Sequence, residues 1–183
     1  MEFKDIKDEV AYTYGLYFEN NEEILVLKKP NINSFLLNEI TNKILEIFFM
    51  VVIILIFYLI ANLNETEYRW QETIFYFVIV GLITFGKSIH DFLKLRKTVY
   101  ILTNQKIVIQ SNFYNSSTNI IHTQFIQTKD LKKSFIDKKY STGNILIHTG
   151  ETRINDGTTE KVYEKLISIF EPEEFFNKIE IKQ

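Results

Sequence analysis

The sequence predicts an α+β protein in which a two-helix transmembrane hairpin is followed by a small β-roll capped by a C-terminal helix. Two apolar runs, IFFMVVIILIFYLI at 47–60 and TIFYFVIVGLITFG at 73–86, predict the hairpin. Short β-branched runs after residue 97 predict the strands of the roll. A proline followed by two glutamates, at 172–174, predicts the start of the final helix.

The chain of 183 residues is therefore expected to have three regions. These are a cytoplasmic N-terminal segment at 1–43 with a strand at 22–28, the transmembrane hairpin at 44–90 with helices at about 44–63 and 73–89, and a cytoplasmic domain at 97–183.

The first apolar run is long enough to cross a bilayer, and the second is shorter. A spanning helix needs about 17–25 residues, and the second run reaches that length only if Lys87 extends its ammonium group to the interface. A buried helical hairpin in a soluble core is disfavoured, because a core helix is rarely apolar on every face. The first forty residues are polar and acidic, unlike a signal peptide.

Basic residues flank the hairpin on the side away from its connector. They are Lys28, Lys29 and Lys43 before the first helix, and Lys87, Lys94, Arg96 and Lys97 after the second. Because positive charge stays on the cytoplasmic side, both termini are expected in the cytoplasm. Tyr68 and Trp70 would then lie at the outer headgroup level. The excess of lysine over arginine is typical of an AT-rich bacterial genome, so the expected location is the bacterial cytoplasmic (inner) membrane.

The C-terminal region predicts several strands and one amphipathic helix. A two-residue turn at Asn104–Gln105 is expected to join two strands, and Asp156–Gly157 is expected to form another hairpin turn. NFYNSSTN at 112–119 is expected to be a long turn. The strands are predicted at 99–102, 107–109, 119–126, 143–150 and 160–169. Phe175, Phe176 and Ile179 form the apolar face of the final helix.

These features together resemble a known family. The runs YILTNQKIVIQS, KKYSTGNILIHTG and ISIFEPEEFFNKI resemble the bacterial pleckstrin-homology-like (PH-like) domain of membrane proteins. In that family an N-terminal segment ending in a strand and a proline precedes a two-helix membrane hairpin, and EEILVLKKP at 22–30 fits this order. One departure is the hydrophilic KDLKKSFIDKK at 129–139. The resemblance implies a PH-like β-roll and a topology, but little chemistry.

No catalytic, cofactor or metal site is predicted. The chain has no cysteine, and its three histidines form no metal-binding spacing. Phosphate-binding and nucleophile motifs are absent. Glu46 and His90 lie near the cytoplasmic ends of the spans, where water is within reach, so they do not indicate transport. A net charge of −2 does not favour nucleic acid as a partner.

One cluster of lysines is a candidate contact site for lipid or a partner. It consists of Lys129, Lys132, Lys133, Lys138 and Lys139. Near an anionic membrane each lysine contributes about 1 kcal/mol. Asp130 and Asp137 interrupt the cluster, so a solvated face is the alternative interpretation.

The sequence therefore predicts a non-catalytic binding or scaffolding module, anchored in the bilayer, whose partner is another membrane or cytoplasmic protein. The alternatives are an anionic-lipid-binding domain, or a small accessory subunit of a membrane enzyme or transporter. A small membrane enzyme is disfavoured, because no converging catalytic groups are predictable. The oligomeric state is not predicted.

Overall fold

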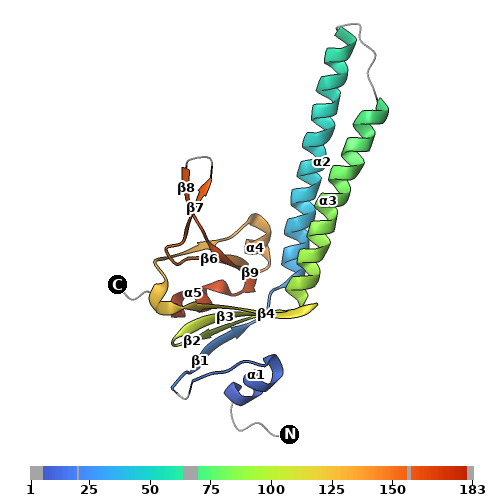
Figure 1. Cartoon of the computed structure of the whole chain (residues 1–183). Coiled ribbons are helices and arrows are strands. Elements are labelled where there is room, and N and C mark those ends of the chain that lie inside the picture. Colours follow the sequence, from blue (N-terminus) through green and yellow to red (C-terminus); the bar gives the residue numbers. More distant parts are fainter. Residues whose placement is uncertain (1–5, 20, 64–69, 156–157, 181–183) are drawn as a thin grey trace.

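Two long helices project from a β-rich body in the computed structural model of the chain, which describes residues 6–19, 21–63, 70–155 and 158–180 (Figure 1). The predicted α+β fold class is confirmed, since helices precede β-sheets and a small C-terminal helix. In chain order the elements are α1 (Ile6–Tyr14), β1 (Ile24–Lys28), α2 (Ile32–Leu63), α3 (Trp70–Arg96), β2 (Thr98–Thr103), β3 (Lys106–Phe113), β4 (Asn115–His122), η1 (Thr123–Phe125), β5 (Thr128–Lys132), α4 (Phe135–Lys139), β6 (Thr142–His148), β7 (Thr152–Asn155), β8 (Thr158–Lys161), β9 (Glu164–Phe170) and α5 (Pro172–Lys178).

The body is a roll of two antiparallel sheets. One sheet has the strand order β1-β2-β3-β4 and the other β5-β6-β9, while β7 and β8 form a separate ribbon. Side chains from the inner faces of both sheets form the core. Its fully buried members include Tyr100, Leu102, Ile107, Ile145, Ile147 and Leu166. The apolar alternation within these strands places one side of each sheet in this core.

The first strand of the roll comes from the segment before the hairpin. β1 pairs with β2, which follows the hairpin, and Lys28 lies opposite Tyr100. Beyond β1, Pro30 forms an isolated bridge with Ile169 of β9, and the Asn31 N–H donates to the Ser168 carbonyl at 2.7 Å. The two sheets are therefore joined along one edge.

The segment that includes α1 covers the outer face of the first sheet. Val10 and Phe18 pack on Val99, Ile101 and Val108, in a small cluster separate from the main core. Both faces of β2 are thus buried, which matches its nearly continuous apolar sequence.

The predicted C-terminal helix is confirmed as α5, with Pro172 in its first turn. Phe175 is 0% exposed and Ile179 2% exposed, and both belong to the main core. Phe176 is only partly buried and lies at the edge of this core. Phe175 is therefore the aromatic ring through which α5 packs on the core of the roll.

The hairpin helices extend beyond their apolar runs. α2 begins at Ile32 rather than near 44, because the Asn31 side-chain oxygen accepts the N–H groups of Asn33 and Ser34, each at 3.1 Å. By length and composition, two segments suffice to cross a membrane: Ile32–Ile60 and Thr73–Arg96. Among the residues whose burial the structure describes, none in the most apolar part of either segment is buried.

The long turn predicted at 112–119 is wrong. β3 continues to Phe113 and β4 begins at Asn115, with a tight turn at Tyr114, whose φ is 56°. The polar residues here pair across the strands instead, since the Gln110 amide donates to Ser116 Oγ at 2.7 Å.

Two other predicted connections can be compared with the structure. The two-residue turn at Asn104–Gln105 is confirmed, because β2 ends at Thr103 and β3 begins at Lys106. The hairpin connector at 64–69, including Tyr68, and the Asp156–Gly157 turn lie outside the described residues.

Candidate functional site

Two cavities, each lined by charged and apolar side chains, lie between the base of the hairpin and the roll. One, of about 650 Å³, is bounded by α2, β5, β6 and β9, together with the segment that includes α4. The other, of about 540 Å³, is bounded by α2, α3, β2, β3, β4 and β9. Both are lined by Phe35 and Glu39 of α2 and by Lys165 and Ile167 of β9, so they adjoin. The two adjoining cavities are called the cleft. A ligand in the cleft would contact both the hairpin and the roll.

The walls of the cleft carry charges of both signs. Its acidic residues include Glu39, Asp91, Asp130 and Glu164, and its basic residues include Lys94, Lys132 and Lys165. Glu39 accepts a hydrogen bond from Ser88 at 3.0 Å, which links α2 to α3. Because neither sign dominates, the cleft is not a strong site for a simple anion.

Tyr100 forms part of the wall of the smaller cavity and ties the two sheets together. Its hydroxyl oxygen accepts the Ile167 N–H at 2.9 Å. Burial raises the pKa of Tyr100 to about 12, so the phenol stays neutral at physiological pH. Its position indicates a structural role.

A buried carboxylate joins α2 to the roll. Asp137 of α4 is 0% exposed, and its Oδ1 accepts hydrogen bonds from Ser34 Oγ at 3.0 Å, Asn38 Nδ2 at 3.0 Å and Thr142 Oγ1 at 2.9 Å. Its Oδ2 accepts the Ser134 N–H at 2.9 Å, which completes a capping box at the start of α4. This group of residues is called the Asp137 junction below.

The hydrogen bonds of the junction favour the ionised carboxylate. Burial by itself would raise the pKa of Asp137, but the donors from Ser134, Thr142 and Ser34 outweigh it, so the pKa lies below its usual value. The junction therefore fixes the start of α2 to α4 and β6 through charge-assisted hydrogen bonds.

Two of the five predicted contact lysines are engaged within the protein. Lys129 donates to the carbonyl oxygens of Phe176 and Ile179, both at 2.7 Å, and its ammonium lies 4.4 Å from the centre of the Phe176 ring. It thereby satisfies carbonyl groups at the C-terminal end of α5, and burial lowers its pKa. Lys133 pairs with Glu173, and the hydrogen bond from Lys133 holds the pKa of Glu173 below its usual value.

The other three lysines of the cluster are exposed. Within the described residues, no hydrogen bond or ion pair engages the side chains of Lys132, Lys138 or Lys139. Lys138 and Lys139 lie on α4, which the Asp137 junction holds beside the base of α2. That the cluster contacts lipid or a partner stays a prediction, and the structure leaves three of its side chains available for it.

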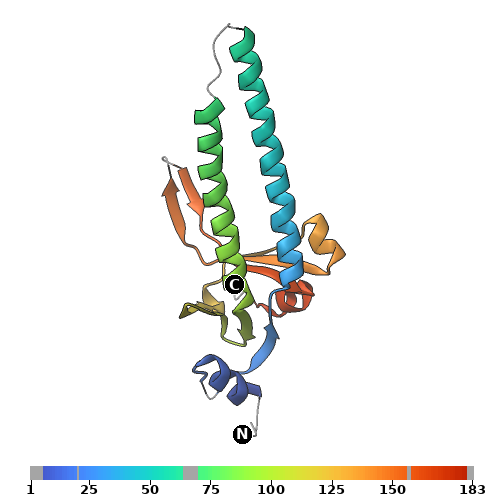
Figure 2. The same ribbon diagram turned by 90° about the vertical axis from the view of Figure 1, so that its right-hand side faces the viewer.

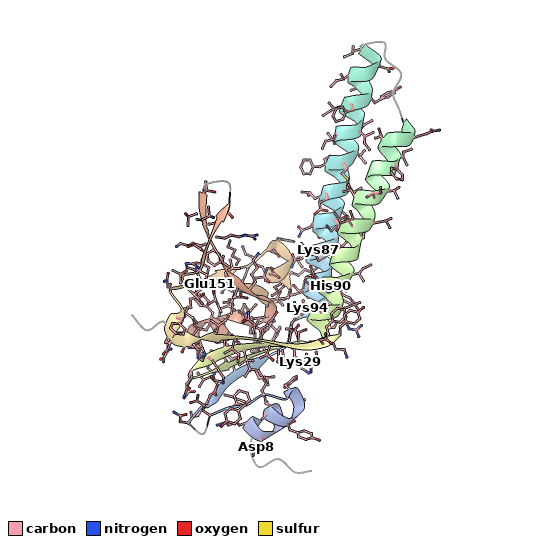
Figure 3. All side chains as sticks on the ribbon, viewed as in Figure 1. Asp8, Lys29, Lys87, His90, Lys94 and Glu151 are labelled. Atoms are coloured by element: carbon pink, nitrogen blue, oxygen red, sulfur yellow. The ribbon has the colours of Figure 1, made fainter. Side chains whose placement is uncertain are left out.

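The histidines lie far apart in the chain and on different elements. His148 is buried and its Nδ1 lies 2.9 Å from the Val162 carbonyl oxygen, whereas His90 lies on α3 near Lys87 and Lys94 (Figure 3). In the described part of the chain, no three acidic, histidine or cysteine side chains gather where they could hold a metal ion.

A comparison with protein-family models identifies the family. The model described as "Bacterial PH domain" matches residues 32–182, which is most of the chain. The protein belongs to the bacterial PH domain family. The match begins at the first residue of α2, so the hairpin of this bacterial PH domain protein lies within the matched region, whereas α1 and β1 precede it.

The predicted resemblance and the PH-like fold are thus confirmed. PH-like domains commonly bind lipids or proteins and are generally non-catalytic. No curated protein and no solved structure matches the chain.

Proposed function

We propose that this bacterial PH domain protein is a non-catalytic binding or scaffolding module, anchored in the cytoplasmic membrane by α2 and α3, that binds another protein at the inner membrane surface. The exposed apolar surface of the hairpin carries the proposal. Phe48 and Leu55 are 62% and 54% exposed, and no described element covers them. Such a surface is stable in lipid and unfavourable in water.

The Asp137 junction supports the scaffolding role. Because it fixes α4 and β6 to the start of α2, the roll is held at a defined position beside the hairpin instead of on a free linker. A domain held close to the bilayer meets other membrane proteins at a raised effective concentration.

The topology is a separate part of the proposal. Lys87, His90 and Lys94 mark the end of α3 that adjoins the roll (Figure 3), and positive charge there favours a cytoplasmic roll. Reporter fusions at both ends of the chain should therefore read cytoplasmic, and a reporter in the connector should read external. A periplasmic roll, or release of the protein by alkaline extraction, would contradict the anchored-module proposal.

Crosslinking in native membranes tests the partner. We expect the wild-type protein to capture a protein partner through its roll, with the hairpin remaining in the membrane. If the captured protein is a membrane enzyme or transporter, the chain is an accessory subunit of that complex. Absence of any protein crosslink under conditions that label the roll would count against protein binding.

Anionic lipid is the second candidate ligand, favoured by the exposed Lys132, Lys138 and Lys139. In nanodiscs, hydrogen exchange of α4 should be the same with neutral and anionic lipid if protein binding is the main function. Stronger protection in anionic lipid that weakens with salt, and disappears when the three lysines become glutamine, would rank lipid first. A Lys161→Gln variant on β8 is a control for loss of one exposed charge elsewhere.

A further inference from the structure

The edge strand β4 lacks the features that usually protect a sheet edge. Natural edge strands carry charges or proline, or are covered by another element. β5 carries Lys129, Asp130 and Lys132. At the opposite edge of the first sheet, the Lys178 ammonium donates to the Leu25 carbonyl of β1 at 3.2 Å, and Pro30 beyond β1 bridges to β9. β4 has the sequence NSSTNIIH, with no Asp, Glu, Lys, Arg or Pro, and all of its residues except Ile121 are exposed.

The unpaired peptide groups of β4 can be assigned from the register. The Thr123 N–H donates to the Gln105 carbonyl at 2.9 Å, so in the antiparallel ladder every second residue before Thr123 bonds to β3. The peptide groups of the alternate residues point away from β3. These outward residues are Ser116, Thr118, Ile120 and His122, and no hydrogen bond within the described residues reaches their peptide groups.

We propose that β4 pairs antiparallel with β4 of a second copy of this chain, giving a two-fold symmetric dimer. The register that uses all four outward residues places Asn119 opposite its own copy, Thr118 opposite Ile120, and Ser116 opposite His122. No formally charged side chains then face each other, so the pairing avoids like-charge repulsion. Ile120, which is 47% exposed, would gain an apolar contact with the methyl group of Thr118.

The orientation of the sheet makes this pairing compatible with a membrane. Antiparallel strands that continue one sheet are related by a two-fold axis perpendicular to that sheet. The strands β2 to β4 run across the direction of α2 and α3 (Figure 1). In both views α1, which covers the outer face of this sheet, lies on the side of the sheet away from the hairpin, so the sheet faces along the hairpin direction (Figure 2). The rotation therefore leaves both hairpins pointing to the same side, as two copies in one bilayer require.

Disulfide crosslinking of single introduced cysteines tests the pairing in the full-length protein in membranes. The natural chain has no cysteine, so any disulfide must form between the introduced ones. In the proposed register the two Cα atoms at Asn119 are about 4.5 Å apart, and those at Ser116 are about 20 Å apart. Mild oxidation should therefore give a disulfide-linked dimer with Asn119→Cys and at least about tenfold less with Ser116→Cys. Adding Ile120→Lys to Asn119→Cys should remove the dimer, because it places a charge on the edge.

The dimer proposal rests on the membrane location proposed above, and the same samples separate the two. Suppose that the protein stays in the alkali-washed membrane. The β4 dimer is then overturned if both positions crosslink equally, if Asn119→Cys gives no crosslink, or if it crosslinks only to a different protein. Loss of the protein from that membrane fraction would instead contradict the anchoring.

Discussion

Replacing Asp137 with alanine should detach the roll from the start of α2. The substitution removes an acceptor for Ser34, Asn38 and Thr142, and it removes the side-chain cap of the Ser134 N–H. Hydrogen bonds to charged groups are worth about 1.5–3 kcal/mol each and a lost cap about 0.5–2 kcal/mol, but part of this is regained because a carboxylate no longer has to be buried. We expect a loss of about 2–4 kcal/mol in the stability of the junction.

Hydrogen exchange of the full-length protein in detergent measures this effect locally. Exchange at α4 and in the first turns of α2 should become faster by a factor of about 30–800, which corresponds to that loss of free energy. Asp130→Asn is a matched control, because Asp130 is an exposed carboxylate on β5 that lines the same cleft. It should leave the exchange unchanged.

Two results would refute this reasoning. If Asp137→Ala leaves exchange at both α4 and α2 equal to that of the control, the buried carboxylate does not hold the hairpin to the roll. If exchange rises throughout the core of the roll instead, Asp137 stabilises the whole domain and does not act as a local junction.

Three further predictions follow from the burial and charge of single side chains. Because folding lowers the pKa of Asp137, its contribution to stability should be complete above about pH 4 and be lost as the pH falls through the lowered pKa. In thermal melts at decreasing pH, the Asp137→Ala variant should lack this acid-dependent loss of stability. Phe175→Ala should cost about 3–5 kcal/mol in chemical unfolding and Phe176→Ala clearly less, whereas equal losses would contradict α5 packing through Phe175. Lys106→Met should lower the free energy of unfolding by about 3–5 kcal/mol, because the buried Glu22 carboxylate loses its ion pair at 3.0 Å. An unchanged unfolding midpoint would show that this ion pair does not hold the N-terminal segment to the sheet.

Features encoded by local sequence were predictable. The apolar runs predict the hairpin, Pro172 with the following glutamates predicts α5, and Asn104 predicts the β2–β3 turn. Each of these depends on a few neighbouring residues and on backbone or solvent preferences. The strand partners of β1 and the cover provided by α1 depend on contacts between distant segments, which periodicity does not encode. The nearly continuous apolar run of β2 carries one such signal, since it indicates burial on both faces.

The lysine-rich segment shows why site residues were harder to predict. Net charge alone does not distinguish Lys129, which satisfies carbonyl groups at the end of α5, from Lys138, which is exposed. By charge alone Asp137 is an interruption of a basic cluster, but in the structure it is the buried acceptor of the junction. The spacing of Ser134 and Asp137 fits a capping box, and this local pattern was available in the sequence.

The pairing of β1 with β2 also sets the order in which this protein can be completed. β1 and β2 form an antiparallel pair whose connecting segment is the whole of residues 29–97, including α2 and α3. At about 5–20 residues per second, β2 leaves the ribosome about 3–14 seconds after β1, and synthesis of the hairpin falls within that interval. During this time β1 has no partner strand and α1 has no sheet to cover. The first sheet therefore closes only after the hairpin has been made, so completion of the roll follows synthesis of α2 and α3 rather than preceding it.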